Sequence, residues 1–189
     1  MVQTKVRFES FEEYLAYDDG TDYLYELFNG ELVALPPKSG RNFSIAGFLF
    51  MQFASILGHQ RVRGHGLELE VRGEPRNRFP DLTILREEHI EQLQRRNTIR
   101  LSMASPLLVV EIVSPGDLQH DRDYIAKKIQ YQDRAVLEYW IIDPQTEEIL
   151  QLSLTETGFT ETTCRQDDRL RSQFAKLDLT AAQVFAAGQ

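Results

Sequence analysis

The segment Leu107–Val113, with the sequence LLVVEIV, restricts the fold of this chain more than any other feature. An apolar run without polar alternation predicts a strand that is covered on both faces, as in the middle of a sheet flanked by helices. Glu111 stands inside this run. Burial of an unpaired carboxylate costs several kcal/mol, so we expect a partner side chain or a cation beside Glu111.

Asp81 raises the same question in a second apolar segment, PDLTIL, where Pro80 fixes the backbone before it. Two carboxylates on neighbouring strands repel each other, and oxygen coordination of Mg²⁺ or Mn²⁺ removes that repulsion. We therefore predict that the two strands are adjacent and that Asp81 and Glu111 bind one divalent ion. The alternative interpretation makes Asp81 a turn residue at the start of its strand and pairs Glu111 with an arginine such as Arg78 or Arg100.

The rest of the chain shows helical and strand periods in mixed order. Helices are expected after Ser10, from Ser39 to Gly58, from Asp117 to Gln132 and after Thr180. Strands are expected in a hairpin around Asn29-Gly30, at 59–64 with 67–72, at 80–85, at 107–113, and at 137–143 with 147–154. This order predicts an α/β fold, an α+β mixed sheet in which helices flank a central mixed β-sheet.

Length and composition agree with a globular protein. The 189 residues fit a single domain spanning 1–189, and 42% of them are hydrophobic. No apolar run approaches the roughly 20 residues that span a membrane, and the first residues do not resemble a signal peptide, so we expect a cytoplasmic protein. Cys164 is the only cysteine, and we expect it to be inert.

The net charge of −8, from 21 basic and 29 acidic residues, is unfavourable for binding nucleic acid by charge alone. Cations recruited by a carboxylate cluster would make the potential locally positive. The best candidates for phosphate contacts are the stretch RVRGHG and the arginines that follow it; the alternative is a set of solvated loops. These arginines are Arg72, Arg76, Arg78, Arg95, Arg96 and Arg100.

Several segments together resemble one known family. They are PD before an apolar strand, VVEIVSP, a lysine four residues before Tyr131, and EYWIIDP. This combination resembles the Uma2 family, also called DUF820, a branch of the PD-(D/E)XK nuclease superfamily that is abundant in cyanobacteria. The resemblance extends from YELFNGELV to EYWIIDP. It implies a restriction-endonuclease-like core and a Mg²⁺- or Mn²⁺-dependent endonuclease that acts on nucleic acid, in particular DNA.

The resemblance assigns roles to individual residues. It implies that Asp81 and Glu111 are the metal ligands, that Lys127 is the companion lysine, and that Glu26 is a third acidic residue of the catalytic site. The usual superfamily lysine stands two residues after the second acid, where this chain has Val113. Helical spacing alone does not choose between Lys127 and Lys128, and either could instead be a surface lysine.

Other polar and aromatic residues have weaker expectations. Asn42 occupies a position where relatives carry histidine, and it cannot act as a base near neutral pH. We expect His59, His65, His89 and His120 to be ordinary surface or loop residues. Tyr139 and Trp140 are expected in the core or at a dimer interface, and together with the need to cut two strands they suggest a homodimer.

Two other functions compete with the nuclease. The first is a catalytically inactive DNA-binding or interaction protein on the same fold, favoured by the acidic net charge and by the absence of lysine at position 113. The second is a hydrolase with a nucleophilic serine or cysteine. The chain contains no G-x-S-x-G motif and no clear Cys–His pair, so this second alternative is disfavoured.

Overall fold

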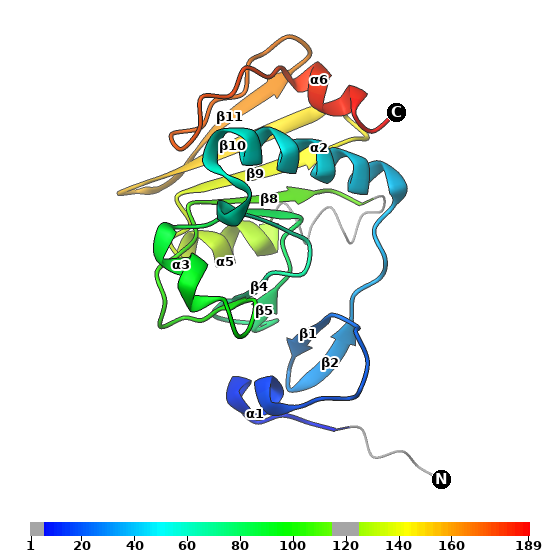
Figure 1. Cartoon of the computed structure of the whole chain (residues 1–189), viewed down its shortest axis with the longest axis vertical. Helices are drawn as coiled ribbons and strands as arrows, with labels where there is room; N and C mark the ends of the chain where they lie inside the picture. The colour runs from blue at the N-terminus through cyan, green and yellow to red at the C-terminus, as the bar shows by residue number, and fades with distance from the viewer. Residues whose placement is uncertain (1–5, 115–124) are drawn as a thin grey trace.

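A six-stranded mixed sheet forms the centre of the computed structural model, which describes residues 6–114 and 125–189 (Figure 1). The strand order is β11-β10-β9-β8-β6-β3, with β8 parallel to β9 and the other neighbours antiparallel. The strands are β3 (Val62–Gly64), β6 (Leu82–Ile84), β8 (Leu108–Ile112), β9 (Glu138–Asp143), β10 (Glu148–Thr155) and β11 (Gly158–Arg165). The predicted mixed sheet flanked by helices is confirmed.

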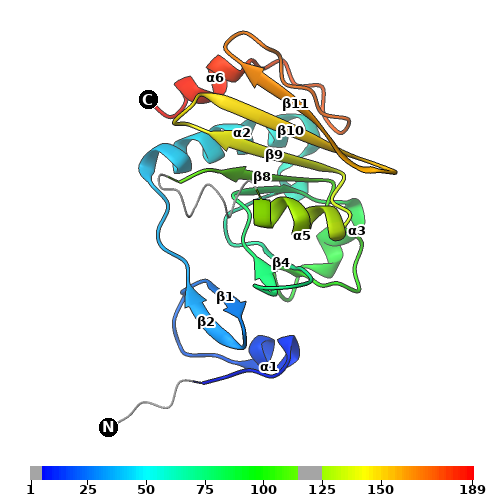
Figure 2. The same cartoon turned by 180° about the vertical axis from the view of Figure 1, so that it is seen from behind.

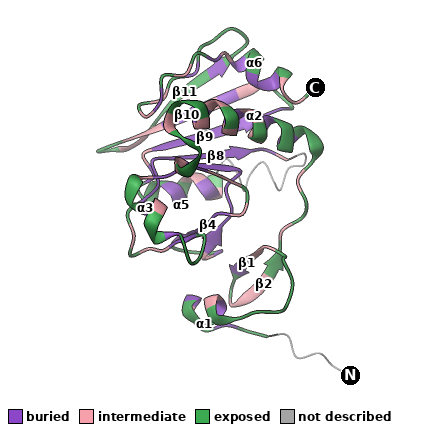
Figure 3. Ribbon diagram, viewed as in Figure 1, coloured by how far each residue is buried: buried purple, intermediate pink, exposed green. Residues whose placement is uncertain are grey.

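Helices cover the two faces of this sheet, as Figures 1 and 2 show from opposite sides. Helix α2 (Gly40–Leu57) packs on one face, where it shares a core with alternate residues of β8 such as Val110 and Ile112. Helix α5 (Lys127–Asp133) packs on the other face, where Tyr131 meets Val109 and Val113. The central strands are therefore buried on both sides (Figure 3), which explains the unbroken apolar run at 107–113.

The long helix α2 begins and ends where its sequence predicts. Ser39 caps it, because its Oγ accepts a hydrogen bond from the Asn42 backbone N–H at 3.2 Å. Gly58 ends it with a φ of +84°, a conformation that side-chain-bearing residues rarely adopt. The predicted helices after Ser10 and Thr180 are confirmed as α1 (Phe11–Ala16) and α6 (Ala181–Ala186).

The N-terminal unit joins the rest of the chain through a buried asparagine. It consists of α1 and the predicted hairpin β1 (Tyr25–Phe28) and β2 (Glu31–Ala34). Asn77 Oδ1 accepts from the Leu27 N–H at 2.7 Å, and its Nδ2 donates to the Tyr25 carbonyl at 2.9 Å. These two bonds hold the hairpin against a second, three-stranded sheet, β5 (Asn77–Arg78), β4 (Glu68–Glu70) and β7 (Thr98–Ile99).

Some predicted boundaries were wrong. The expected strand at 59–64 begins with a 3₁₀ turn, η1 (His59–Arg61), because Gly58 redirects the chain before β3. The expected strand at 67–72 is reduced to β4. The expected helix at 117–132 is seen as α5 only from Lys127, and its proposed start lies outside the described residues. Four elements were not predicted, since they are short or polar: β5, β7, β11 and α3 (Glu87–Gln92).

Tyr139 and Trp140 both lie in the core of the molecule. Tyr139 is packed edge-on against Tyr131, and Trp140 packs against Phe53 of α2. These aromatics therefore give no support to a dimer interface, and the homodimer stays a prediction, as does the single-domain organisation. Among the described residues, no helix combines the length and the apolar character needed to cross a membrane.

A prediction for stability follows from Glu138, which is buried at the start of β9. Its Oε1 accepts from the Gln173 N–H at 2.6 Å, while its Oε2 is buried without a partner. Burial raises the pKa of Glu138 above its usual 4.5, so the folded state loses stability as the pH rises through that raised pKa. We expect Glu138→Gln to raise the free energy of unfolding at neutral pH by up to about 1 kcal/mol.

Urea titrations at several pH values test this prediction. The gain should disappear below pH 4.5, where the carboxyl of the wild type is also neutral. Glu156→Gln, on an exposed turn, is the control and should show no such pH dependence. A Glu138→Gln protein that is less stable than the wild type at neutral pH would show that the ionised carboxylate is stabilising.

Candidate metal centre

Asp81 and Glu111 meet across the β6–β8 pair. The antiparallel register pairs Leu82 with Val110, and one further step places Asp81 across from Glu111. The Asp81 N–H donates to the Val110 carbonyl at 3.1 Å, and Asp81 Oδ2 accepts from the Ile112 N–H at 2.8 Å. The predicted adjacency of these two strands is therefore confirmed.

The Asp81 carboxylate continues the hydrogen bonding between β6 and β8 beyond the last backbone pair. The Ile112 N–H needs an acceptor, and Asp81 Oδ2 provides it in place of a backbone carbonyl. Asp81 is only 3% exposed. It is thus more than a turn residue at the start of a strand, since its carboxylate is held beside the residue that follows Glu111.

Glu111 is fully buried and has two partners from α5. Lys127 Nζ lies 2.6 Å from its Oε2, and the Tyr131 hydroxyl donates to its Oε1 at 2.6 Å. Lys127 and Tyr131 are four residues apart and therefore project from the same side of the helix. Burial, followed by the charge of Glu111, raises the pKa of Tyr131 well above its usual value, which keeps the phenol a hydrogen-bond donor.

The two lysines of α5 are distinguished by the structure. Lys127 points inward to Glu111, whereas Lys128 forms a surface ion pair with Glu161 of β11. In the alternative interpretation Glu111 pairs with an arginine. The structure pairs it with Lys127 instead, whereas Arg78 pairs with Glu26 and Arg100 pairs with Glu70 and Glu12.

A second lysine, which sequence analysis did not single out, reaches Asp81. Lys38 Nζ lies 3.0 Å from Oδ1 and 3.2 Å from Oδ2 of Asp81. Lys38 follows Pro36-Pro37 in the connection between β2 and α2, where prolines favour an extended chain. The only sequence signal was a lysine next to the helix cap Ser39, which does not by itself predict a distant partner.

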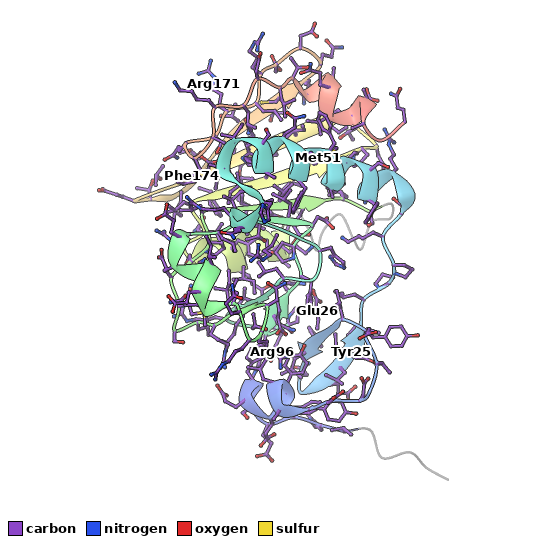
Figure 4. All side chains as sticks on the ribbon, viewed as in Figure 1. Tyr25, Glu26, Met51, Arg96, Arg171 and Phe174 are labelled. Carbon is purple, nitrogen blue, oxygen red and sulfur yellow. The ribbon has the colours of Figure 1, made fainter. Side chains whose placement is uncertain are left out.

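Glu26 belongs to strand β1 of the hairpin, on the side that faces the main sheets (Figure 4). Its carboxylate accepts from Arg78 Nη1 at 3.2 and 3.4 Å, and Arg78 Nε donates to Gln130 Oε1 of α5 at 2.7 Å. Glu26 is thus joined to α5 through an arginine. The structure gives it a role in positioning the helix that carries Lys127.

Asn42 and the histidines differ in their surroundings. Asn42 Nδ2 donates to the carbonyls of Ile112 and Val113 at 3.3 Å, which fixes the start of α2 to the end of β8. His65 lies near the site. Its pKa is lowered below the usual value, chiefly by partial burial, although the charges of Asp81 and Glu111 act in the opposite direction.

The expectation of surface or loop positions was wrong for His89, which is fully buried in α3 and bonded through both ring nitrogens. His59 is exposed in η1, and His120 lies outside the described residues.

Two carboxylates fit the preference of Mg²⁺ or Mn²⁺ for oxygen ligands. Mg²⁺ is commonly held by one or two carboxylates while it keeps several waters or contacts a phosphate, so a third protein ligand is not required. In the described part of the chain, no group of three or more His, Cys, Asp or Glu side chains is arranged to hold a metal ion. Glu26 therefore does not complete a larger cluster with the pair.

The arginines proposed for phosphate contacts are largely engaged by acids. Arg78 is buried with Glu26, and Arg96 and Arg100 pair with Glu68 and Glu70 of β4. On the surface, Arg61 pairs with Glu87, Arg72 with Asp133 and Arg76 with Glu74. These ion pairs reduce the positive potential that the sequence suggested.

The fold of this chain has a counterpart among solved structures. One solved structure with the same fold is the crystal structure of "a putative nuclease belonging to DUF820 from Anabaena variabilis ATCC 29413". It is 17% identical, with a TM-score of 0.69, and the match covers 94% of this chain and 98% of that chain. At this identity the likeness establishes the fold alone.

The chain belongs to the Uma2 family, whose description is "Putative restriction endonuclease" and whose family model matches residues 11–182. No curated protein matches the chain in sequence. The matched region contains Glu26, Asp81, Glu111 and Lys127, but it assigns no role to any of them.

The buried Lys127–Glu111 pair generates a prediction for stability. Removal of one partner of a buried ion pair leaves an uncompensated charge and costs about 3–5 kcal/mol, whereas an exposed pair contributes about 0–1 kcal/mol. We therefore expect Lys127→Met to lose several kcal/mol of unfolding free energy in metal-free buffer, as measured by urea titration. Lys128→Met is the matched control and should change it by less than about 1 kcal/mol. Equal losses in the two variants would contradict the structural assignment of Lys127.

Proposed function

We propose that this chain is a Mg²⁺- or Mn²⁺-dependent nuclease of the PD-(D/E)XK type that hydrolyses phosphodiester bonds in nucleic acid, in particular DNA. The observation that supports this proposal most strongly is the cross-strand pair of Asp81 and Glu111 with Lys127 in direct contact with Glu111. Membership of a family described as "Putative restriction endonuclease" agrees with it.

Each residue of the site has a separate task in this proposal. Asp81 and Glu111 would hold the divalent ion, which supplies a Lewis acid that offsets charge on the reacting phosphate. Lys127 keeps its ammonium beside Glu111, where it can donate a hydrogen bond to a phosphate oxygen or orient a water molecule. Tyr131 holds the other oxygen of Glu111 and so fixes the orientation of that carboxylate.

The position of the lysine departs from the usual superfamily order, and the structure offers a physical explanation. Val113 occupies the usual position and is buried in the core shared with Tyr131, so a lysine there would replace core packing. Lys127 approaches the same carboxylate from α5 instead. A lysine on a helix can therefore pair with the same acid that a lysine on the strand accompanies in the usual arrangement.

The alternative, a catalytically inactive DNA-binding or interaction protein, is favoured by a different observation. Both acids already have a lysine partner, Lys38 for Asp81 and Lys127 for Glu111, so the charges are compensated without a metal ion. An inactive relative would need only these ion pairs. Divalent-ion binding and cleavage distinguish the two functions.

Substitution of the acids tests the nuclease directly. With Mn²⁺ and a mixture of single-stranded, linear and supercoiled DNA, the wild type should cleave at least one form. Asp81→Asn and Glu111→Gln should each lower the rate roughly 100-fold or more, because loss of a ligand carboxylate weakens metal binding and removes the positive charge that would offset the charge on the reacting phosphate. Glu161→Gln, which removes a surface partner of Lys128, is the control and should retain activity. Equal rates in all four proteins would refute the assignment of these carboxylates.

Lys38 supplies a second test that does not depend on cleavage. Its ammonium occupies the cationic position beside Asp81, so it should compete with a divalent ion for that carboxylate. We expect Lys38→Met to bind Mn²⁺ up to about 10-fold more tightly than the wild type, as measured by electron paramagnetic resonance of free Mn²⁺. Lys128→Met should bind Mn²⁺ like the wild type. Weaker binding by Lys38→Met would contradict this competition.

A further inference from the structure

A cavity of about 800 Å³ opens beside Asp81, between the N-terminal unit and the start of α2. Its lining combines apolar and aromatic side chains with a few polar ones, and includes Tyr23, Lys38, Phe43, Phe50, His65 and Asp81. Cavities that bind small molecules commonly measure about 300–1,000 Å³ and have this mixture. The size and the lining therefore suit a planar organic group that lies next to Asp81.

Two lining aromatics are unusually exposed. Tyr23 is 69% exposed in the segment before β1, and Phe43 is 74% exposed in the first turn of α2. Phe50 stands seven residues after Phe43, on the same side of the helix, with Gly47 between them. The small residue at 47 leaves the space beside the rings open, so their faces are available to a flat partner.

The polar members of the lining suit a nucleotide. Lys38 brings a positive charge for a phosphate, and the exposed His65 ring brings hydrogen-bonding groups for the edge of a base. Asp22 and Asp81 are the acidic members of this lining. When a divalent ion takes Asp81, the Lys38 ammonium becomes available to a phosphate in the same cavity.

A base inside a duplex cannot occupy this cavity, because its neighbours already cover both of its faces. Exposed aromatic rings instead bind unpaired bases, and each stacked base contributes about 1–3 kcal/mol. Duplex binding depends more on cationic side chains, and here the net charge is −8 and the arginines at 72, 76, 78, 96 and 100 form ion pairs with acids. The chain is therefore better suited to single strands.

We propose that this cavity binds unpaired nucleobases and that the substrate is single-stranded DNA, delivered by Tyr23 and Phe43 to Asp81 and Glu111. The cleavage step of this inference rests on the proposed nuclease function, while the binding step does not. Two observations favour a nucleic acid over an apolar partner. The cavity reaches Asp81, and Lys38 is part of its lining.

Binding without metal tests the inference. A fluorescein-labelled oligothymidine about 12 nucleotides long is titrated with protein in EDTA, and fluorescence anisotropy compares it with the duplex of the same length. We expect at least about 10-fold tighter binding of the single strand. Phe43→Ala and Tyr23→Ala should each weaken that binding about 5- to 150-fold, the equivalent of one lost stacking contact.

Met51→Ala is the matched control. Met51 is 62% exposed on the same helix α2 (Figure 4) but is not part of the cavity lining, so its loss should leave binding unchanged. Binding of the duplex as tightly as the single strand, absence of binding, or equal losses in Met51→Ala and Phe43→Ala would each overturn the inference.

Two further outcomes separate this inference from the nuclease itself. If the oligomer binds at the cavity but no form of DNA is cleaved with Mn²⁺, the nuclease proposal fails while the binding site stands. If duplex DNA is cleaved and Phe43→Ala cleaves it as fast as the wild type, the nuclease stands and the inference fails. It also fails if light scattering shows that Phe43→Ala dissociates a dimer without changing affinity for the oligomer, since a second copy would then cover the cavity.

Discussion

The burial of Glu111 in the central strand is the constraint on which the site and much of the fold depend. A carboxylate with no exposed surface in β8 requires compensation, and α5 provides it through Lys127 and Tyr131. This contact fixes α5 on one face of the sheet. On the adjoining strand, Asp81 accepts from the Ile112 N–H and holds β6 in register. The groups proposed to bind metal are thus also the groups that join the strands and the helix.

Charge compensation by lysines links the N-terminal unit to this centre. Lys38 comes from the connection between the hairpin and α2, and it meets Asp81 at 3.0 Å. Asn42, in the first turn of α2, donates to the carbonyls at the end of β8, while Glu26 of the hairpin holds Arg78 beside α5. Elements distant in the sequence therefore surround the acidic pair and form the cavity beside it. In the proposed function, the Lys38–Asp81 ion pair separates, so that a divalent ion binds Asp81 and a nucleotide phosphate binds Lys38.

The sequence predicted those parts of the fold that depend on local periodicity. The unbroken apolar run predicted β8 in the centre of the sheet, and Ser39 and Gly58 predicted the ends of α2. Both features depend on residues that are close together in the sequence. The short polar strands β5 and β7 have no such period. The adjacency of Asp81 and Glu111 could be inferred from two acids in apolar strands. The pairings of Lys38 and Arg78 could not, since each joins residues 43 or 52 positions apart in the sequence.

Anomalous diffraction from a crystal soaked in Mn²⁺ tests the central claim most directly. The account predicts a strong peak bound by oxygen atoms of both Asp81 and Glu111, at Mn–O distances close to the 2.0–2.1 Å typical of Mg²⁺, with the ammonium of Lys38 moved away from Asp81. Absence of a peak between the two carboxylates at saturating Mn²⁺, with the Lys38–Asp81 and Lys127–Glu111 pairs intact, would contradict it. The buried acids would then be structural ion-pair residues of the sheet.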